Sequence, residues 1–184
     1  MLITNEYTYK TNRQNIIDGW SRKNFMSAKM IDVLLLSIIV TLLYAVTALI
    51  IGITNTDQDA GKWSLAYYVA LFFLQTFCQL SIAFTVGMLL KKAFIALAVF
   101  TFYSMIVEEF AVNLLKYKYK SEIGQYFPIE ISDRLLTKPI FISKFGETAY
   151  QQSLAAVKYH VVYSICLLML TWLFCFWLNN KRDL

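Results

Sequence analysis

The sequence predicts an all-α fold, a polytopic membrane bundle of four transmembrane helices preceded by a short surface helix. Hydrophobic residues make up 58% of the 184 residues and charged residues 16%, against roughly 45–50% and 25% in soluble domains. Four apolar runs are each long enough to cross the hydrocarbon core of a bilayer, which takes about 20 residues of helix. Lipid offers no partner to backbone N–H and C=O groups, so each run should satisfy them internally as a helix.

The expected spans divide the chain into a polar segment, 1–29, and one transmembrane domain, 30–184. The spans cover residues 30–53, 63–90, 93–115 and 159–178. A cleavable signal peptide is not expected, because the first apolar run begins near residue 30 and is too long for the apolar region of a signal peptide.

The long connection between the third and fourth spans, 116–158, is expected to form short amphipathic helices at the outer membrane surface. Pro128 and Pro139 divide it into pieces. Basic and aromatic residues alternate at 116–120, a pattern typical of the membrane interface. The apolar residues that would give these pieces a half-buried face are Ile129, Ile131, Leu135, Leu136, Ile140, Phe141 and Ile142.

The placement of lysine and arginine predicts the orientation of the bundle. With four spans both ends of the chain lie on one side, which carries Lys10, Arg13, Arg22, Lys23, Lys29, Lys91, Lys92, Lys181 and Arg182. The clearest signal is the pair of lysines at 91 and 92, in a tight turn between two spans. Because cytoplasmic loops are enriched in Lys and Arg, we expect a multi-pass protein of the cell (inner or plasma) membrane with both termini in the cytoplasm.

A short helix is expected ahead of the first span. Thr11 and Gln14 have the spacing of a capping box, in which two side chains satisfy backbone donors at a helix start. Gly19 is suited to end that helix, and Ser21 can cap a second helix that continues into the first span. The short helix would be about two turns, or roughly 10 Å, long.

The charges of this short helix are placed unfavourably for the helix itself. Arg13 lies near the positive end of the helix dipole and Asp18 near the negative end, each costing about 0.3 kcal/mol. Groups that do not stabilise their own helix can instead contact a partner. The alternative is an amphipathic segment that lies on anionic lipid, helped by Arg22, Lys23 and Lys29.

A family resemblance is carried by residues 5–29, NEYTYKTNRQNIIDGWSRKNFMSAK. This stretch resembles the segment between the second and third spans in permeases of ABC (ATP-binding-cassette) transporters of the type-two exporter class. In that family the short helix is a coupling helix, which docks into a groove of the cytoplasmic ATPase subunit. The resemblance implies an ATPase-coupling role for Glu6, Thr11, Arg13, Gln14, Ile16, Ile17, Asp18, Gly19, Ser21 and Arg22.

The resemblance also implies a layout and a set of partners. Family members have three further helices after the coupled one, with short amphipathic outer helices before the last, as expected here for 30–184. Their usual half-transporter has six spans, and the two that precede the coupling helix have no counterpart in this sequence. We therefore expect a permease subunit that is a fragment, has a misassigned start or is divergent and short. It would work with an ABC ATPase subunit and with a second permease copy or homologue as a dimer.

The chain itself is not expected to be an enzyme. A nucleotide-binding loop needs Gly, four residues and then Gly-Lys-Ser/Thr, whereas Gly61 and Lys62 are followed by Trp63. ATP hydrolysis is therefore expected on a separate subunit. Nucleic acid is not an expected partner, because the basic residues behind the net charge of +5 are scattered among the membrane flanks.

No metal or other cofactor is expected either. Cys78, Cys166 and Cys175 form no CxxC pair and fall inside the spans, where they should be apolar filler. His160 is the only histidine of the chain. It stands at the start of the fourth span, where a membrane-interface histidine is expected and a pH-sensing role is the alternative.

Two pairs of polar residues fall inside the expected spans. Gln75 and Gln79 are one turn apart and should share a face, either to bond a neighbouring helix or to line a substrate path. Glu108 and Glu109 would be costly in a membrane and suggest function, but they stand roughly 24 Å along the helix from Ala93, near its outer end. An interfacial ion cluster and a site that faces the transport path both remain open.

Two functions from different classes fit the sequence. The first is the permease subunit of an ATP-driven exporter, whose segment from Thr11 to Gly19 transmits movement from a separate ATPase. The second is a stand-alone four-span regulatory or immunity protein whose basic segment lies on lipid. An ATPase partner distinguishes the first from the second.

Overall fold

The structure is a computed structural model, which describes residue 4 and residues 21–55, 62–120, 122–136 and 147–181. These residues form an all-α arrangement of α3 (Arg22–Asn55), α4 (Lys62–Leu90), α5 (Ala93–Phe102), the π-helical turn η1 (Tyr103–Val107), α6 (Glu108–Lys118), the 3-10 helix η2 (Glu122–Tyr126), α7 (Pro128–Asp133) and α8 (Glu147–Lys181). The described part has four segments long and apolar enough to span a membrane: Arg22–Ile51, Ala66–Leu90, Ala93–Lys118 and Leu154–Lys181. The predicted membrane bundle of four transmembrane helices is confirmed.

The helices at the two ends of the bundle are longer than the expected spans. The first helix starts at Arg22, ahead of the expected span at 30–53. The last helix starts at Glu147, so residues 147–158, expected in the outer connection, belong to it instead. The reason is local, because no Gly or Pro interrupts 147–181 and Gly146 precedes it.

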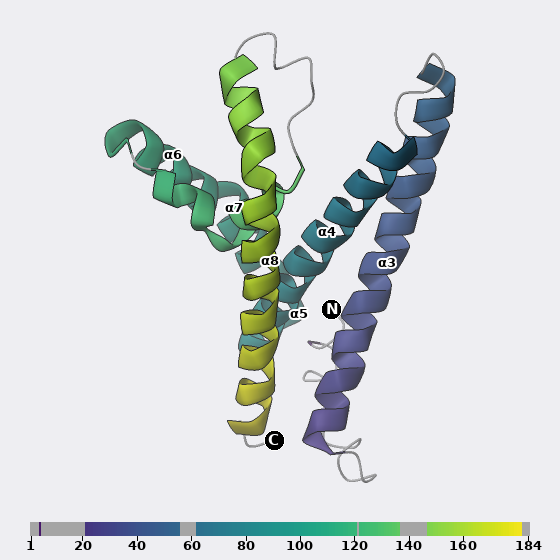
Figure 1. Cartoon of the computed structure of the whole chain (residues 1–184). Coiled ribbons are helices and arrows are strands. Elements are labelled where there is room, and N and C mark those ends of the chain that lie inside the picture. Colours follow the sequence, from purple (N-terminus) through teal and green to yellow (C-terminus); the bar gives the residue numbers. More distant parts are fainter. Residues whose placement is uncertain (1–3, 5–20, 56–61, 121, 137–146, 182–184) are drawn as a thin grey trace.

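Helix α4 is the centre of the bundle, since it contacts α3, α5, α7 and α8. It crosses obliquely between α3 and α8 (Figure 1). The main core lies where these three helices meet and contains Met26, Val33, Phe77, Phe84, Met88, Trp172 and Cys175. Outside this core, apolar side chains along α3, α5 and α8 are exposed, which is expected of helices whose outer faces contact lipid.

Two side-chain contacts fix α8 against α4 inside the core. The rings of Phe84 and Trp172 stack with their centroids 5.3 Å apart. The indole Nε1–H of Trp172 donates to Ser81 Oγ at 3.0 Å, so the polar atom of this buried side chain is satisfied. The predicted role of Cys78 and Cys175 as core filler fits their burial, whereas Cys166 is exposed.

The turn between α4 and α5 is as tight as the sequence predicts. Lys91 has φ of 57°, a left-handed conformation that is uncommon outside Gly. Its backbone N–H donates to Gly87 O at 3.0 Å and so closes α4. Lys92 then adopts an extended conformation and accepts a bond from Ala96 N at 2.9 Å as α5 begins.

After α6 the chain folds back into the bundle through η2 and α7. Lys120, with φ of 48°, makes the turn. A Cβ on Gly124 would lie 3.1 Å from the Cα of Val112, so Gly allows η2 to approach α6 closely. Pro128 is the first residue of α7, where its missing N–H costs nothing.

Helix α7 does not lie on the outer surface as a half-buried helix, which corrects the expectation for this part of the connection. It packs against α4 and α8, and in Figure 1 it lies between α6 and α8. Ile129 and Ile131 are buried, and Leu135 just beyond the helix is fully buried with Leu71 and Val157. The predicted apolar face exists at Ile129, Ile131 and Leu135, but protein covers it in place of lipid. Three further predicted residues of this face, Ile140, Phe141 and Ile142, lie outside the described part of the chain.

Candidate functional site

The expected coupling residues lie mostly outside the described part of the chain. These are Glu6, Thr11, Arg13, Gln14, Ile16, Ile17, Asp18 and Gly19. Ser21 and Arg22 are described, and both take part in the start of α3. The Asn24 N–H donates to Ser21 Oγ at 3.1 Å, so the predicted cap of a helix that continues into the first span is confirmed.

The first turn of α3 is tied to the last turn of α8. The side chain of Asn179 donates through Nδ2 to Arg22 O at 2.9 Å. In return, the guanidinium Nη1 of Arg22 donates to Asn180 O at 3.2 Å. We call Arg22, Asn179 and Asn180 the α3–α8 clasp. The start of the first span is therefore fixed against the end of the last span.

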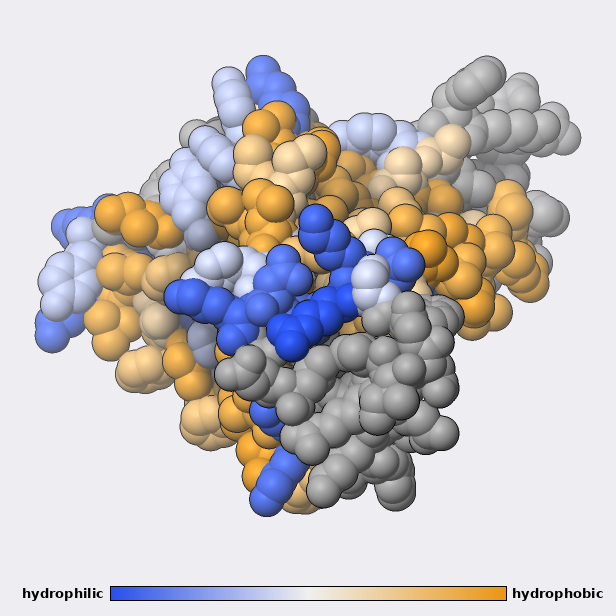
Figure 2. Space-filling view, turned by 90° about the horizontal axis from the view of Figure 1, so that it is seen from below, coloured by the Kyte–Doolittle hydropathy of each residue, from blue (hydrophilic) through white to orange (hydrophobic). Residues whose placement is uncertain are grey.

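The clasp belongs to a hydrophilic end of the molecule. Viewed from below, hydrophilic residues gather in a band that hydrophobic residues border (Figure 2). At the start of α3, Lys29 pairs with Asp32 at 3.3 Å, while Lys23 is exposed. At the end of α8, Lys181 Nζ lies 4.6 Å from the ring centroid of Trp177. This end is therefore polar and basic, as the edge of a membrane protein that faces water should be.

Gln75 and Gln79 share one face of α4, as predicted, and both point at α7. The Nε2 atoms of Gln75 and Gln79 donate to Asp133 Oδ1 at 3.1 and 2.6 Å. Gln79 Nε2 also lies 3.5 Å from Ser132 Oγ. Burial raises the pKa of the Asp133 carboxyl and neighbouring Glu130 adds to the rise, while the two glutamine bonds oppose it.

Glu108 and Glu109 have different environments although they are neighbours. Glu108 is 3% exposed, and its Oε1 accepts the N–H groups of Ile129 at 2.8 Å and Glu130 at 2.6 Å. These are two of the free donors at the start of α7, so Glu108 caps that helix from a different helix. Glu109, the next residue of α6, is exposed.

The π-helical turn η1 sets the direction in which Glu108 points. The backbone N–H of Glu108 bonds to Tyr103 O, five residues back, where an α-helix would bond four back. The phenol of Tyr103 lies beside the Glu108 carboxylate. Such turns are often found at functional positions, and here the turn delivers a carboxylate to the start of α7.

His160, predicted as a membrane-interface histidine at the start of the fourth span, is buried on α8. Its side chain is 3% exposed, and its ring stands edge-on to Tyr163 with centroids 6.4 Å apart. Among the described residues, four buried side-chain atoms have no hydrogen-bond partner: Gln75 Oε1, Glu108 Oε2, His160 Nδ1 and Ser164 Oγ. All four belong to helices that surround or abut α7.

We call Gln75, Gln79, Glu108, Ser132, Asp133 and His160 the α7 junction. Sequence reasoning found the two glutamines and Glu108 but missed Ser132 and Asp133, which come from the connection. The available signal was the polar pair at the end of the apolar stretch that starts at Pro128. In the described part of the chain no three His, Cys, Asp or Glu side chains are grouped to hold a metal ion. What the junction does is hold a short polar-ended helix among membrane helices.

Comparison with known proteins gives a family for the chain. No curated protein and no solved structure matches it. A family model described as "Protein of unknown function (DUF2705)" matches residues 1–184, the full length of the sequence. The chain therefore belongs to the DUF2705 family.

Proposed function

We propose that this chain is a permease subunit of an ATP-driven ABC exporter, and that a separate ATPase subunit supplies the hydrolysis. The observation that carries the proposal is the entry into the first span. Ser21, within the polar segment 1–29, caps α3, and Arg22 ties that entry to Asn179 and Asn180 at the end of α8. A force applied to the polar segment would reach two spans at once.

The order of the elements supports the same proposal. Three spans follow α3, and the short helices η2 and α7 stand between the third and the fourth. This is the layout that the resemblance of residues 5–29 implies for the exporter permeases. The outer face of α5 and α6 is unpacked in the described part, with Phe94, Met105 and Phe110 strongly exposed. This face is available to lipid and to the second permease copy that the proposal requires.

Charge supports a cytoplasmic position for both termini in the cell membrane. The clasp joins the start of the first span to the end of the fourth, so these two ends share a side. Lys23, Lys91, Lys92 and Lys181 stand at the span ends on that side. The positive-inside rule assigns such an end to the cytoplasm, where an ATPase subunit would be found.

Helix α3 is suited to transmit the movement of a coupling segment. It is continuous over 34 residues and packs along α4 and α8. Proline is absent from it, so no kink of the usual kind would absorb a displacement of its first turn. Movement at Ser21 would therefore be passed along the bundle, including to α7 through α4.

Co-purification from native membranes tests the proposal. The chain carries a C-terminal tag, and mass spectrometry identifies what accompanies it. We expect an ABC ATPase in near-equal amount, lost on Arg13→Glu or Gly19→Pro while membrane insertion survives. Lys118→Glu, the same charge change at the opposite end of the bundle, is the matched control and should retain the ATPase.

Two results would contradict the proposal. One is capture of the ATPase that Arg13→Glu and Gly19→Pro leave unchanged, which would remove the coupling assignment. The other is a tagged chain that purifies alone or only with copies of itself, which would favour a stand-alone four-span protein.

A further inference from the structure

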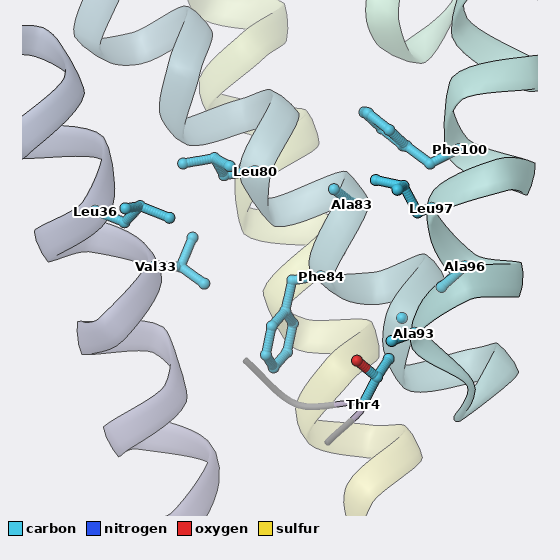
Figure 3. A pocket seen from close by; sticks show the side chains of 11 residues that line it. Thr4, Val33, Leu36, Leu80, Ala83, Phe84, Ala93, Ala96, Leu97 and Phe100 are labelled. Atoms are coloured by element: carbon cyan, nitrogen blue, oxygen red, sulfur yellow. The ribbon is translucent and has the colours of Figure 1, made fainter. Parts of the chain in front are cut away.

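The bundle has an apolar cavity of about 180 Å³ between α3, α4 and α5. Figure 3 shows its lining side chains, which include Val33 of α3, Phe84 of α4 and Leu97 of α5. The cavity exists because α3 and α5 both pack on α4 and small residues face the space between them. Gly87 and Ala96 are two of these small residues.

Thr4 enters this cavity from a distant part of the sequence. Its side chain lies among the lining residues in Figure 3, beside Ala93 and below Phe84. Only 2% of Thr4 is exposed. The two residues before it in the sequence, Leu2 and Ile3, are apolar.

We propose that this cavity is the docking site of the chain's own segment around Thr4, and that it anchors the coupling segment at a second point. The first anchor is Ser21, which caps α3. Residues 5–20, which contain the coupling residues from Glu6 to Gly19, are the chain between the two anchors. The docking itself follows from the packing of Thr4; its role in transmission rests on the proposed function.

The second anchor gives the coupling segment a contact with a different part of the bundle. Ser21 leads into α3, whereas the cavity is formed by α4 and α5 as well. Gly87 and Ala93 lie on either side of the Lys91-Lys92 turn, so Thr4 packs near the point where these two helices join. Displacement of the segment would therefore act on the spacing of α3 and α5, in addition to the clasp.

Disulfide crosslinking tests the docking in the full chain in its native membrane. Cys78, Cys166 and Cys175 are first replaced by Ser or Ala, and a protease site is placed in 56–61 so that a crosslink holds the two fragments together. Thr4→Cys is paired with Ala96→Cys, which is buried in the cavity, or with Phe94→Cys, which is 81% exposed on the outer face of α5. We expect the Ala96 pair to crosslink about tenfold faster than the matched Phe94 pair, because only rare local opening would bring Thr4 to the outer face.

A labelling experiment guards against a misfolded pair. Single Thr4→Cys should react with a maleimide about tenfold more slowly than single Lys23→Cys, which is exposed at the start of α3. Equal labelling of the two cysteines, or equal crosslinking of the Ala96 and Phe94 pairs, would overturn the docking. If a lipid chain occupied the cavity in place of the segment around Thr4, we would expect both equal labelling and equal crosslinking.

The outcome also separates the docking from the proposed function. Selective crosslinking of the Ala96 pair without a co-purified ATPase leaves the docking in place and removes its role in an exporter. Capture of the ATPase by a chain whose Thr4→Cys is freely labelled removes the docking alone. Loss of ATPase capture on crosslinking, restored by reduction, supports both.

Discussion

The α3–α8 clasp and the α7 junction both use polar bonds between helices, but they differ in what surrounds the bonds. The clasp lies at the basic end of the bundle, and next to it is the larger apolar core around Met26, Phe84 and Trp172. The α7 junction lies among the membrane helices, and the apolar cluster beside it is smaller. The bond from Ile129 N–H to Glu108 in the junction is buried, so its loss leaves a buried polar group, whereas the bond from Arg22 to Asn180 O in the clasp is exposed and water can replace it.

The type of acceptor differs as well. In the clasp, Arg22 and Asn179 donate to backbone carbonyls, which exist whatever residue stands there. In the junction, the acceptors are the carboxylates of Glu108 and Asp133. The position of α7 therefore depends on a few side chains, and single substitutions should affect the two regions unequally.

Glu108→Ala should have the largest effect. It leaves the N–H groups of Ile129 and Glu130 without their acceptor, at a cost of about 3 kcal/mol in the free energy of unfolding. Glu109→Ala, at the exposed neighbour, should stay within about 0.5 kcal/mol of the parent. SDS titration in mixed micelles measures both. Glu108→Gln keeps an acceptor oxygen and should recover part of the loss; equal effects of the two alanine variants would contradict the capping role.

Gln79→Ala should come next, with a loss of about 1.5 kcal/mol, near the upper limit measured for such bonds between membrane helices. Gln75→Ala should cost less, because its bond to Asp133 is longer, 3.1 against 2.6 Å. A double-mutant cycle with Asp133→Ala checks the assignment. Once Asp133 is removed, Gln79→Ala should have little further effect, and fully additive losses would mean that the two residues act independently.

Asn179→Ala should destabilise the clasp by about 1 kcal/mol, the usual net value of one hydrogen bond. Asn180→Ala is the matched control, because Asn180 contributes its backbone carbonyl to the clasp and keeps it after substitution. Thermal unfolding followed by tryptophan fluorescence compares the two. If both variants unfold at the parent temperature, the side chain of Asn179 does not stabilise the clasp.

Lys120→Gly and Lys118→Gly should have opposite signs. Lys120 has φ of 48°, and Gly at a left-handed position should stabilise the turn by about 0.5–1 kcal/mol. Lys118 is in the last turn of α6, where Gly should cost about 0.5–1 kcal/mol. The same unfolding measurement tests both, and a shared sign would show that loss of a lysine charge dominates.

Asp133→Asn should have the smallest effect at neutral pH and the clearest pH dependence. Burial raises the pKa of Asp133 above its ordinary 3.8, so the protonated form favours folding. That contribution is fully present below 3.8 and is lost as the pH rises through the raised pKa. The stability of Asp133→Asn relative to the parent should therefore increase with pH over that window and then level off. Because Asp133 is partly exposed, solvent screening reduces the change; a relative stability independent of pH would contradict the assignment.

The sequence was sufficient for the transmembrane helices and for the start of the first one. Long apolar runs that cross a membrane have to form helices, because lipid offers their backbone groups no partner. Ser21 has the side chain of an ordinary helix N-cap. Gln75 and Gln79 were identifiable because helical spacing alone places them on one face. The coupling assignment and the transport function remain predictions.

The partners of these residues could not be predicted, for a physical reason. Whether the stretch from Pro128 to Leu136 covers its apolar face with lipid or with protein depends on where η2 leads the chain. That in turn depends on the close approach of Gly124 to Val112, which is a tertiary contact. Glu108 and Glu109 point about 100° apart around the helix, and which of them faces α7 depends on the π-helical turn before them, which no residue pattern indicates.

The π-helical turn lets the third span hold one residue more than a regular α-helix would between the same two bonded levels. Each residue of an α-helix advances the chain by about 100° around the axis. If Tyr103–Val107 instead closed as a regular α-helix with all five residues kept, everything after it would rotate about the helix axis by about a quarter-turn. The face that now presents Glu108 to α7 would then present a neighbour, so conversion between the π and α forms of this turn would change which residue caps α7.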